Sequence, residues 1–171
     1  MVKLESSAFC LREWQPTDEQ ALVKYANNPR VSANLFDSFP YPYTVEDARQ
    51  WIASQQNIEK PTFFTVELDG EAAGGIGVVL KQDVYRHGAN IGYWLGERFW
   101  GQGITTEVVK LMVDYAFQNF DLLRLQAGVY NSNPASMRVL EKVGFVKEGI
   151  ARKAVFKRGE FLDEHIYSLV R

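Results

Sequence analysis

The segment Arg98-Phe99-Trp100-Gly101-Gln102-Gly103 decides how this chain is interpreted. It stands directly before residues 104–120, where apolar side chains recur at the spacing of a helix. Glycine at 101 and 103 lets the backbone take a positive φ and come close to a ligand. The first amides of the helix, at Ile104 and Thr105, have no partner within it, and the helix dipole is positive there. The segment therefore predicts a cradle for an anion such as a diphosphate, although an ordinary strand–helix turn has the same spacing.

Two common nucleotide-binding loops do not match this segment. A phosphate-binding loop of NTPases needs lysine followed by serine or threonine after its last glycine, and neither follows Gly103 in that way. A dinucleotide fingerprint needs a third glycine and a place near the first strand, whereas this segment lies late in the chain. The spacing alone leaves the identity of the diphosphate open.

Outward from this segment, the apolar pattern predicts a mixed order of elements in 171 residues, a length typical of one domain at about 150 residues each. The predicted strands span residues 9–14, 62–68, 72–80, 89–95, 123–130, 150–157 and 164–170. The predicted helices span residues 17–27, opened by a capping box at 17–20 and closed by Pro29, and residues 44–56, 104–120 and 134–143. Hairpins come first and a β-α-β-α-β run later. A single α+β domain over residues 1–171 is therefore predicted, not a doubly wound nucleotide fold.

Composition limits the partners of the protein. The 19 basic and 21 acidic residues give a net charge of -2, so we expect no direct nucleic-acid partner and no attraction to an anionic membrane. There is no stretch of signal-peptide length at the start and no run of ~20 apolar residues, so a cytoplasmic protein is expected. One cysteine, Cys10, and two histidines, His87 and His165, predict no metal site.

The pattern Arg98-x-x-Gly101-x-Gly103 resembles the signature of the GNAT superfamily of N-acetyltransferases. Residues 90–95 and the segment 133–145 (Asn133-Pro134-Ala135-Ser136-Met137-Arg138 onward) are similar to the RimJ/RimL-like branch, the ribosomal-protein N-terminal acetyltransferases. With residues 11–14 and the tail 159–169, the similarity covers essentially the whole chain. It implies a GNAT-type acyl-CoA N-acyltransferase fold: a twisted, mostly antiparallel mixed sheet with helices on both faces. The strands on either side of the main helix splay apart to admit a thioester.

The resemblance also implies acetyl-CoA as cosubstrate, no metal, and direct attack of a primary amine through a tetrahedral intermediate. It implies free amides on a bulged strand near Trp94 and Leu95 for the carbonyl and the pantetheine arm. Asn133 is expected to bind the arm, and it can at the same time cap the helix that starts at Pro134. The expected cofactor-binding residues are Trp94, Leu95, Arg98, Phe99, Trp100, Gly101, Gln102, Gly103, Ile104, Thr105, Asn133 and Arg138. Lys142 either joins Arg138 at the phosphates or belongs to a solvated basic face.

The catalytic positions depart from the wider superfamily. Leu140 stands where many members place a tyrosine that protonates the leaving thiolate, so Ser136 becomes the expected acid, unless it is only a residue of the helix's first turn. Asn90 stands where relatives often carry a glutamate base, and an amide cannot accept the ammonium proton. A water held by Asn90, a carboxylate such as Asp37 or Glu97, or loss of the proton to solvent are the remaining routes.

The loop of residues 36–43 is rich in aromatic side chains and contains two prolines, so it cannot form regular structure. Phe36, Asp37, Phe39 and Tyr41 are predicted to bind a cationic amine, although a proline-stiffened cover of the core explains the loop equally well. The expected acceptor is a protein N-terminal α-amine. The alternatives are a small amine (polyamine, amino acid or aminoglycoside) and a non-catalytic acyl-CoA-binding protein. A monomer and a homodimer both stay open.

Overall fold

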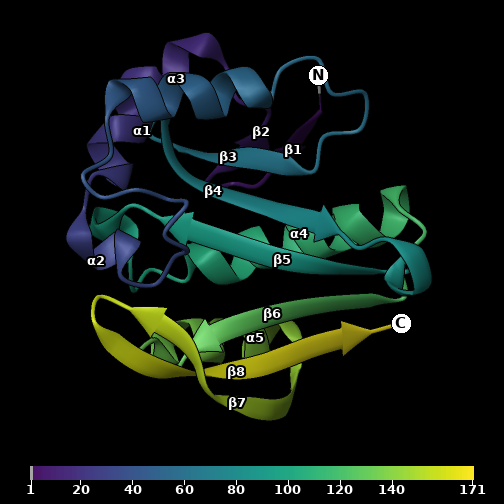
Figure 1. Ribbon diagram of the computed structural model, residues 1–171. Coiled ribbons are helices and arrows are strands. Elements are labelled where there is room, and N and C mark those ends of the chain that lie inside the picture. The colour runs from purple at the N-terminus through teal and green to yellow at the C-terminus, as the bar shows by residue number, and fades with distance from the viewer. Residues whose placement is uncertain (1) are drawn as a thin grey trace.

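The computed structural model describes residues 2–171, which form one eight-stranded sheet in the order β1-β2-β3-β4-β5-β6-β8-β7 (Figure 1). The strands are β1 (Lys3–Glu5), β2 (Cys10–Arg12), β3 (Phe63–Leu68), β4 (Glu71–Leu80), β5 (Gly88–Leu95), β6 (Arg124–Tyr130), β7 (Val146–Lys157) and β8 (Glu160–Val170). The α-helices are α1 (Glu19–Ala26), α2 (Pro29–Ser32), α3 (Val45–Ser54), α4 (Ile104–Asn119) and α5 (Pro134–Val143). The strands and helices predicted from the sequence are present, with shifted ends.

The sheet splits where β5 meets β6. These two strands are the parallel neighbours, and they pair only from Gly88 to Asn90 on β5. Beyond Asn90, β5 stays paired with β4 as far as Leu95, while β6 stays paired with β8 as far as Tyr130. The mostly antiparallel sheet and the splayed strand pair expected from the resemblance are therefore confirmed.

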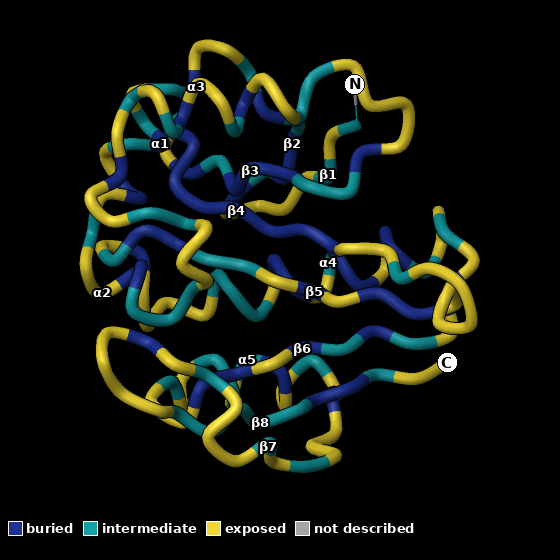
Figure 2. Tube along the Cα trace, in the orientation of Figure 1, coloured by how far each residue is buried: buried dark blue, intermediate teal, exposed yellow. Residues whose placement is uncertain are grey.

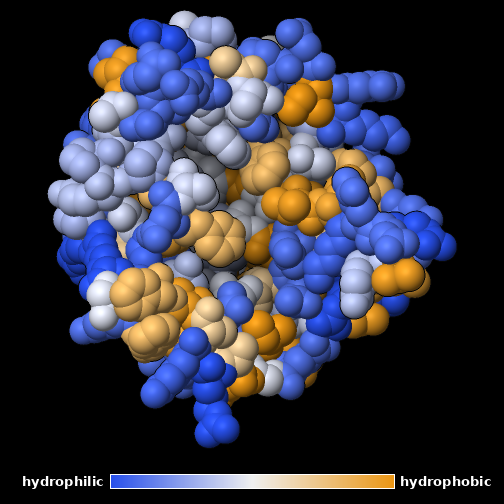
Figure 3. All heavy atoms as spheres, viewed as in Figure 1, coloured by the Kyte–Doolittle hydropathy of each residue, from blue (hydrophilic) through white to orange (hydrophobic). Residues whose placement is uncertain are grey.

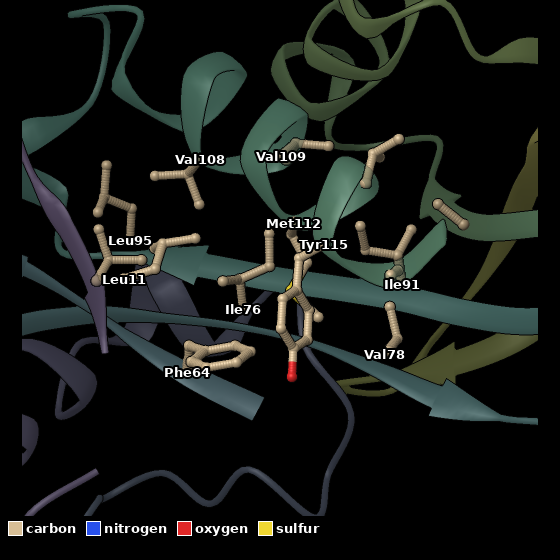
Figure 4. Packing of buried hydrophobic residues seen from close by; sticks show 14 of the residues in the cluster. Leu11, Phe64, Ile76, Val78, Ile91, Leu95, Val108, Val109, Met112 and Tyr115 are labelled. Atoms are coloured by element: carbon tan, nitrogen blue, oxygen red, sulfur yellow. The ribbon is translucent and has the colours of Figure 1, made fainter. Parts of the chain in front are cut away.

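Helices cover both faces of the sheet and bury a core on each. Val108, Val109 and Met112 of α4 pack over Ile76 and Ile91 of the strands (Figure 4). Met112 is fully buried, which contributes roughly 1.5–3 kcal/mol by the hydrophobic effect. On the opposite face, α1 and α3 bury a smaller cluster. Its buried members are Trp14, Leu22, Ala26, Tyr43, Ala48, Ile52 and Ala72.

The start of α1 differs from the sequence prediction. The capping box expected at residues 17–20 lies two residues earlier, because Asp18 ends a 3₁₀ turn (Pro16–Asp18) and its carboxylate accepts from Gln15 N–H (2.8 Å). The same carboxylate accepts from both terminal nitrogens of Arg12 at 2.8 Å. Pro29 does not close this helix, which ends at Ala26. Pro29 instead opens α2, where its fixed φ suits the first helical position. At α3 the predicted box is present, since Thr44 caps the helix together with Asp47.

The β7–β8 hairpin joins the two halves of the split sheet. Near its turn, Lys157 donates to Asp37 Oδ1 (2.7 Å) in the loop that precedes α3. The neighbouring Arg158 donates to Pro29 O (2.8 Å) and to Ser32 Oγ (3.1 Å) in α2. The turn is exposed on its outer side (Figure 2), but these contacts hold it against the N-terminal half. None of the described helices combines the length and the apolar character needed to cross a bilayer.

Candidate active site

The divergence of β5 and β6 opens a cleft of ≈ 1420 Å³ between the two halves of the molecule. Figure 3 shows the hollow, with hydrophobic atoms along its walls. Most of the predicted site residues line it: Phe36, Phe39, Asn90, Trp94, Leu95, Phe99, Trp100, Gly101, Gly103, Ile104, Thr105, Asn133, Ser136 and Arg138. Four of the predicted residues do not: Asp37, Tyr41, Arg98 and Gln102.

The glycine loop has the backbone that an anion cradle needs. Gly101 and Gly103 take φ values of 74° and 78°, and a Cβ built on either meets open space. Within the described chain, no acceptor takes the N–H groups of residues 101–105, and the first bond of the turn runs from Thr106 N–H to Gly103 O (3.2 Å). These amides stand at the positive end of a 16-residue helix, so they fit a diphosphate.

The side chains of this loop hold it in place from outside the cleft. Arg98 pairs with Asp69 (3.1 Å), and Gln102 donates to Arg98 O (3.0 Å), so both turn away from the cleft. The Trp100 indole donates to Leu95 O (2.7 Å), which ties the loop to the end of β5. Arg98 and Gln102 are therefore placed to offer their main chain rather than their side chains to a ligand.

The free main-chain groups of β5 belong to its odd-numbered residues. At the ends of the ladder, Gly88 O accepts from Lys81 N–H just after β4 (2.9 Å), and Gly96 N–H donates to Ala73 O of β4 (2.8 Å). Because main-chain groups alternate along a strand, Trp94 also faces β4, whereas Tyr93 and Leu95 face the gap left by β6. The bulge expected at residues 94–95 is absent from the described ladder, whose register runs without a shift. The split alone exposes these groups.

A pair of hydroxyl groups faces the gap from the α5 side. Tyr93 Oη lies 2.7 Å from Ser136 Oγ, and burial raises the pKa of Tyr93 to about 12. Ser136 sits in the first turn of α5, where its N–H donates to Asn133 Oδ1 (3.3 Å), so Asn133 is the helix cap that was expected as one of its roles. Leu140, which stands where many members place a tyrosine, is fully buried in the core and does not line the cleft.

Sequence reasoning missed Tyr93, because no motif marks a tyrosine inside a strand as a partner of Ser136. The two residues are 43 positions apart, and only the register of β5 against β4 turns Tyr93 toward α5. A signal was nevertheless present: Ile91, Tyr93 and Leu95 alternate, which places them on one face of a strand.

A carboxylate faces the cleft from the face of the sheet opposite to α5. Glu164 of β8 lines the cleft and pairs with Tyr130 on β6. Its side chain lies over Gly128 of β6, where a Cβ would collide with the Glu164 carboxylate. Within residues 2–171, the Glu164 carboxylate accepts no hydrogen bond and forms no ion pair. Sequence reasoning missed it, since an acidic residue in a strand has no distinctive pattern.

The two carboxylates considered earlier as bases are engaged elsewhere. Asp37 is bound by Lys157, whose side chain is only 8% exposed. Glu97 accepts from Asn28 Nδ2 (2.7 Å) and pairs with Arg30. Neither lines the cleft, so the expectation that one of them serves the site is not supported. Asn90 does line it and is exposed on the same side of β5 as Trp94.

A split sheet, a cradle of free amides at a helix N-terminus and free strand amides beside it define an acyltransferase that takes its acyl group from a diphosphate-bearing thioester. The chain belongs to the acetyltransferase (GNAT) domain family, whose model matches residues 8–146. It is an N-acetyltransferase, and acetyl-CoA is its cosubstrate. The resemblance in the sequence is thereby confirmed.

Similar proteins carry names that refer to different acceptor substrates. The probable N-acetyltransferase YjcK of Bacillus subtilis is 42% identical over 137 residues, or 75% of this chain and 74% of that protein. The putative ribosomal N-acetyltransferase YdaF of Bacillus subtilis is 32% identical, covering 86% and 75%. The spermidine N(1)-acetyltransferase of Escherichia coli is also 32% identical, covering 88% and 80%. The solved RimL ribosomal-protein acetyltransferase with coenzyme A shares the fold, with a TM-score of 0.85, 24% identity and coverage of 99% and 98%.

Proposed function

We propose that this acetyltransferase acts on the N-terminal α-amine of a polypeptide. The observation that carries the proposal is an exposed aromatic rim where the turn of the β7–β8 hairpin meets the loop before α3. The rings of Phe156 and Phe161 contact each other at a tilt, with centroids 5.0 Å apart, near this turn, and they are 60% and 66% exposed. Phe36, 72% exposed, lies next in the chain to Asp37, which Lys157 holds against that hairpin. A rim of this kind offers contact area to residues that follow the reacting one in a peptide.

The charges of the cleft support the same acceptor over a polyamine. Among the described residues that line it, Asp47 and Glu164 are the acidic ones, and Asp47 is already engaged by Thr44 N–H (2.7 Å). One available carboxylate matches an acceptor that brings one ammonium group. A polyamine brings several, and each needs a partner when it leaves water.

When bound, acetyl-CoA supplies the acetyl group as a thioester. The amides of residues 101–105 hold its diphosphate, while the N–H groups of Tyr93 and Leu95 hold the pantetheine arm and the acetyl carbonyl in the gap. Asn133, whose Oδ1 is occupied by the cap, offers its amide nitrogen to the arm, and Arg138 offers a charge to the phosphates. Asn90 lies where it can orient the acceptor or a water.

Proton transfer falls to groups on the two sides of the gap. Glu164 binds the acceptor ammonium and takes its proton, directly or through one water. On the other side, with Tyr93 as the donor in its hydrogen bond to Ser136 Oγ, the serine O–H can donate to the sulfur as negative charge leaves with it. The presence of both groups argues against a purely acyl-CoA-binding protein, which would need neither.

An acceptor panel tests the proposal by the release of free CoA thiol. The panel contains a peptide with a free N-terminus and no lysine, the same peptide with a formylated N-terminus, spermidine, free amino acids and an aminoglycoside. We expect turnover with the free peptide alone, and a mass increase of one acetyl group on its first residue. Turnover with spermidine but not with the peptide would overturn the proposal in favour of a small-amine acetyltransferase.

A further inference from the structure

Two glycines of β4 make room for an aromatic floor on the acceptor side of the cleft. A Cβ at Gly75 would lie 2.7 Å from the Trp94 indole nitrogen, and one at Gly77 would collide with the ring of Phe63. Both rings therefore lie flat over β4, where larger residues would displace them. The glycines serve the surface of the cleft, since their φ values are ordinary for a strand.

Aromatic side chains from three other segments surround this floor. Trp51 of α3 meets Trp14 edge-on at 6.4 Å and Phe63 at 5.4 Å. Phe39 of the preceding loop meets Trp94 at 5.4 Å. Together with Tyr43, these side chains line the cleft beneath α3. We call this region the aromatic pocket, and it consists of Trp14, Phe39, Tyr43, Trp51, Phe63 and Trp94.

A buried donor without a partner lies at the base of the aromatic pocket. Trp14 is 3% exposed, and within residues 2–171 its Nε1–H has no hydrogen-bond partner. Its Cζ2 atom, two bonds from Nε1, would stand 3.4 Å from a Cβ at Gly75, which is part of the cleft floor. An unsatisfied buried donor destabilises the free protein, so a ligand that brings an acceptor there recovers this cost.

The charges around the aromatic pocket decide what it can take. The cations that line the described cleft, Arg138 and Lys142, are on α5, in the other half of the molecule. Asp47, an acidic residue of the cleft lining between Tyr43 and Trp51, is held by the Thr44 cap, which keeps its pKa low. Aromatic faces attract cations, but ammonium and guanidinium groups only donate hydrogen bonds and cannot satisfy the Trp14 N–H. The donor therefore favours a neutral side chain over a cationic one.

We propose that the aromatic pocket selects the acceptor by its first side chain, and that it takes a large apolar side chain carrying a weak acceptor, such as methionine or an aromatic residue. This inference rests on the proposed function, since a first side chain presupposes an amino-terminal residue. Met and aromatic groups also pack well on aromatic rings. Alanine would leave the pocket unfilled, and lysine would place a charge beside the indole N–H.

Peptides identical except for residue one test the proposal with the full chain and acetyl-CoA. The first residues are Met, norleucine, Phe, Ala and Lys. We expect kcat/KM for Met and Phe to exceed that for Ala and Lys by at least about tenfold, because burial of the larger side chain favours it. Met should exceed norleucine, which has its shape without the sulfur acceptor. Equal rates for all five, or a preference for Lys or Ala, would overturn the inference while the proposed function stands.

Variants assign the preference to the aromatic pocket. Trp51→Ala should remove most of the advantage of Met over Ala, whereas Tyr85→Ala, which loses an exposed aromatic ring far along the chain, should keep it. Trp14→Phe keeps a ring and removes the N–H, so the ratio of Met to norleucine should fall to one. If Trp51→Ala retains the full preference in a folded protein, the pocket does not select the side chain.

Two further arms separate this inference from the proposed function. Phenethylamine carries an aromatic group without a peptide. If phenethylamine is acetylated and none of the peptides is, the proposal of a peptide acceptor fails. The inference that the aromatic pocket selects an apolar group then still holds. If no acceptor is turned over, quenching of tryptophan fluorescence by the Met and Ala peptides still measures binding. Tighter binding of the Met peptide supports the inference, and equal binding overturns it.

Discussion

The two sides of the cleft differ in whether main-chain or side-chain groups form them. The diphosphate cradle on the cofactor side is main chain: two glycines at positive φ and consecutive free amides, all within residues 101–105. The acceptor side is made of side chains from segments far apart in the sequence, including Trp14, Phe63, Trp94 and Glu164. A main-chain site is fixed by a short local sequence, whereas a side-chain site depends on the whole topology. Substitutions should therefore separate the two sides by what they change, affinity for the cofactor or turnover of the acceptor.

The largest effect is expected on the acceptor side, at the carboxylate. Glu164→Gln keeps the size of the side chain but cannot accept the ammonium proton, so turnover should fall by roughly 100- to 10,000-fold, the usual contribution of a general base. Calorimetry should show unchanged affinity for acetyl-CoA. Glu160→Gln, an exposed carboxylate on the same strand, is the matched control and should keep full activity. Full activity of Glu164→Gln would remove this residue from the proton transfer.

The next effect is expected on the cofactor side. Gly101→Val places a branched side chain at a positive φ inside the cradle, and loss of two or so amide–phosphate bonds should weaken acetyl-CoA binding on the order of 100-fold. Calorimetry measures this affinity directly. Gly159→Val is the matched control, because Gly159 has φ 84° and open space around it but lies in the β7–β8 turn. If both folded variants bind acetyl-CoA equally well, the cradle is assigned to the wrong loop.

The sequence predicts the two sides of the cleft to different extents, because one side is main chain and the other is side chains. The loop 98–103, the helix 104–119 and the cap at Asn133 depend on neighbours along the chain, and the sequence locates them within a residue or so. The split of the sheet came from the resemblance rather than from periodicity. Glu164 and Tyr93 were missed, because their place in the cleft depends on strand register, which a single sequence does not fix.

The same reasoning explains where the structure departs from the sequence-based expectation. Asp37 stands in an aromatic loop and was expected to attract a cationic amine, and Lys157, 120 residues later, holds its carboxylate. The capping box expected at residues 17–20 forms two residues earlier, where Asp18 accepts from Gln15 N–H (2.8 Å) and also forms an ion pair with Arg12 on β2. In both cases a cation from another element binds the carboxylate, a tertiary contact that the local sequence does not reveal.

A smaller effect is expected from the hydroxyl pair. Tyr93→Phe removes one hydrogen bond to Ser136, so turnover should fall roughly five- to tenfold, with little change in the KM for acetyl-CoA. Ser136→Ala should cost more, and adding Tyr93→Phe to it should cost little further, because the tyrosine acts through the serine. Tyr115→Phe, which removes a buried hydroxyl bonded to Pro61 O, is the control for lost structure.

The pH dependence sharpens the assignment of Tyr93. Burial raises its pKa to about 12, above its ordinary value of 10, so the phenol stays neutral through pH 6–9 and its ability to donate does not change. The ratio of wild-type to Tyr93→Phe turnover should therefore be flat over that range. A ratio that grows or falls with pH between 6 and 9 would mean that Tyr93 titrates during turnover. Additive losses in the double variant would break its link to Ser136.

The smallest effect is expected where the two halves meet, at the ion pair of Asp37 and Lys157. Asp37→Asn leaves the buried Lys157 ammonium without its charged partner, and since Asp37 itself is 83% exposed, the cost should be only about 1 kcal/mol. Because the pair holds the aromatic loop against the hairpin, hydrogen exchange of residues 33–43 should quicken and the KM for the peptide should rise a few fold. Affinity for acetyl-CoA should stay the same, since the cradle takes no part in this contact. Asp121→Asn, an exposed aspartate outside the cleft, should change none of these. A loss of cofactor affinity equal to the rise in peptide KM would show that the two sides are not independent.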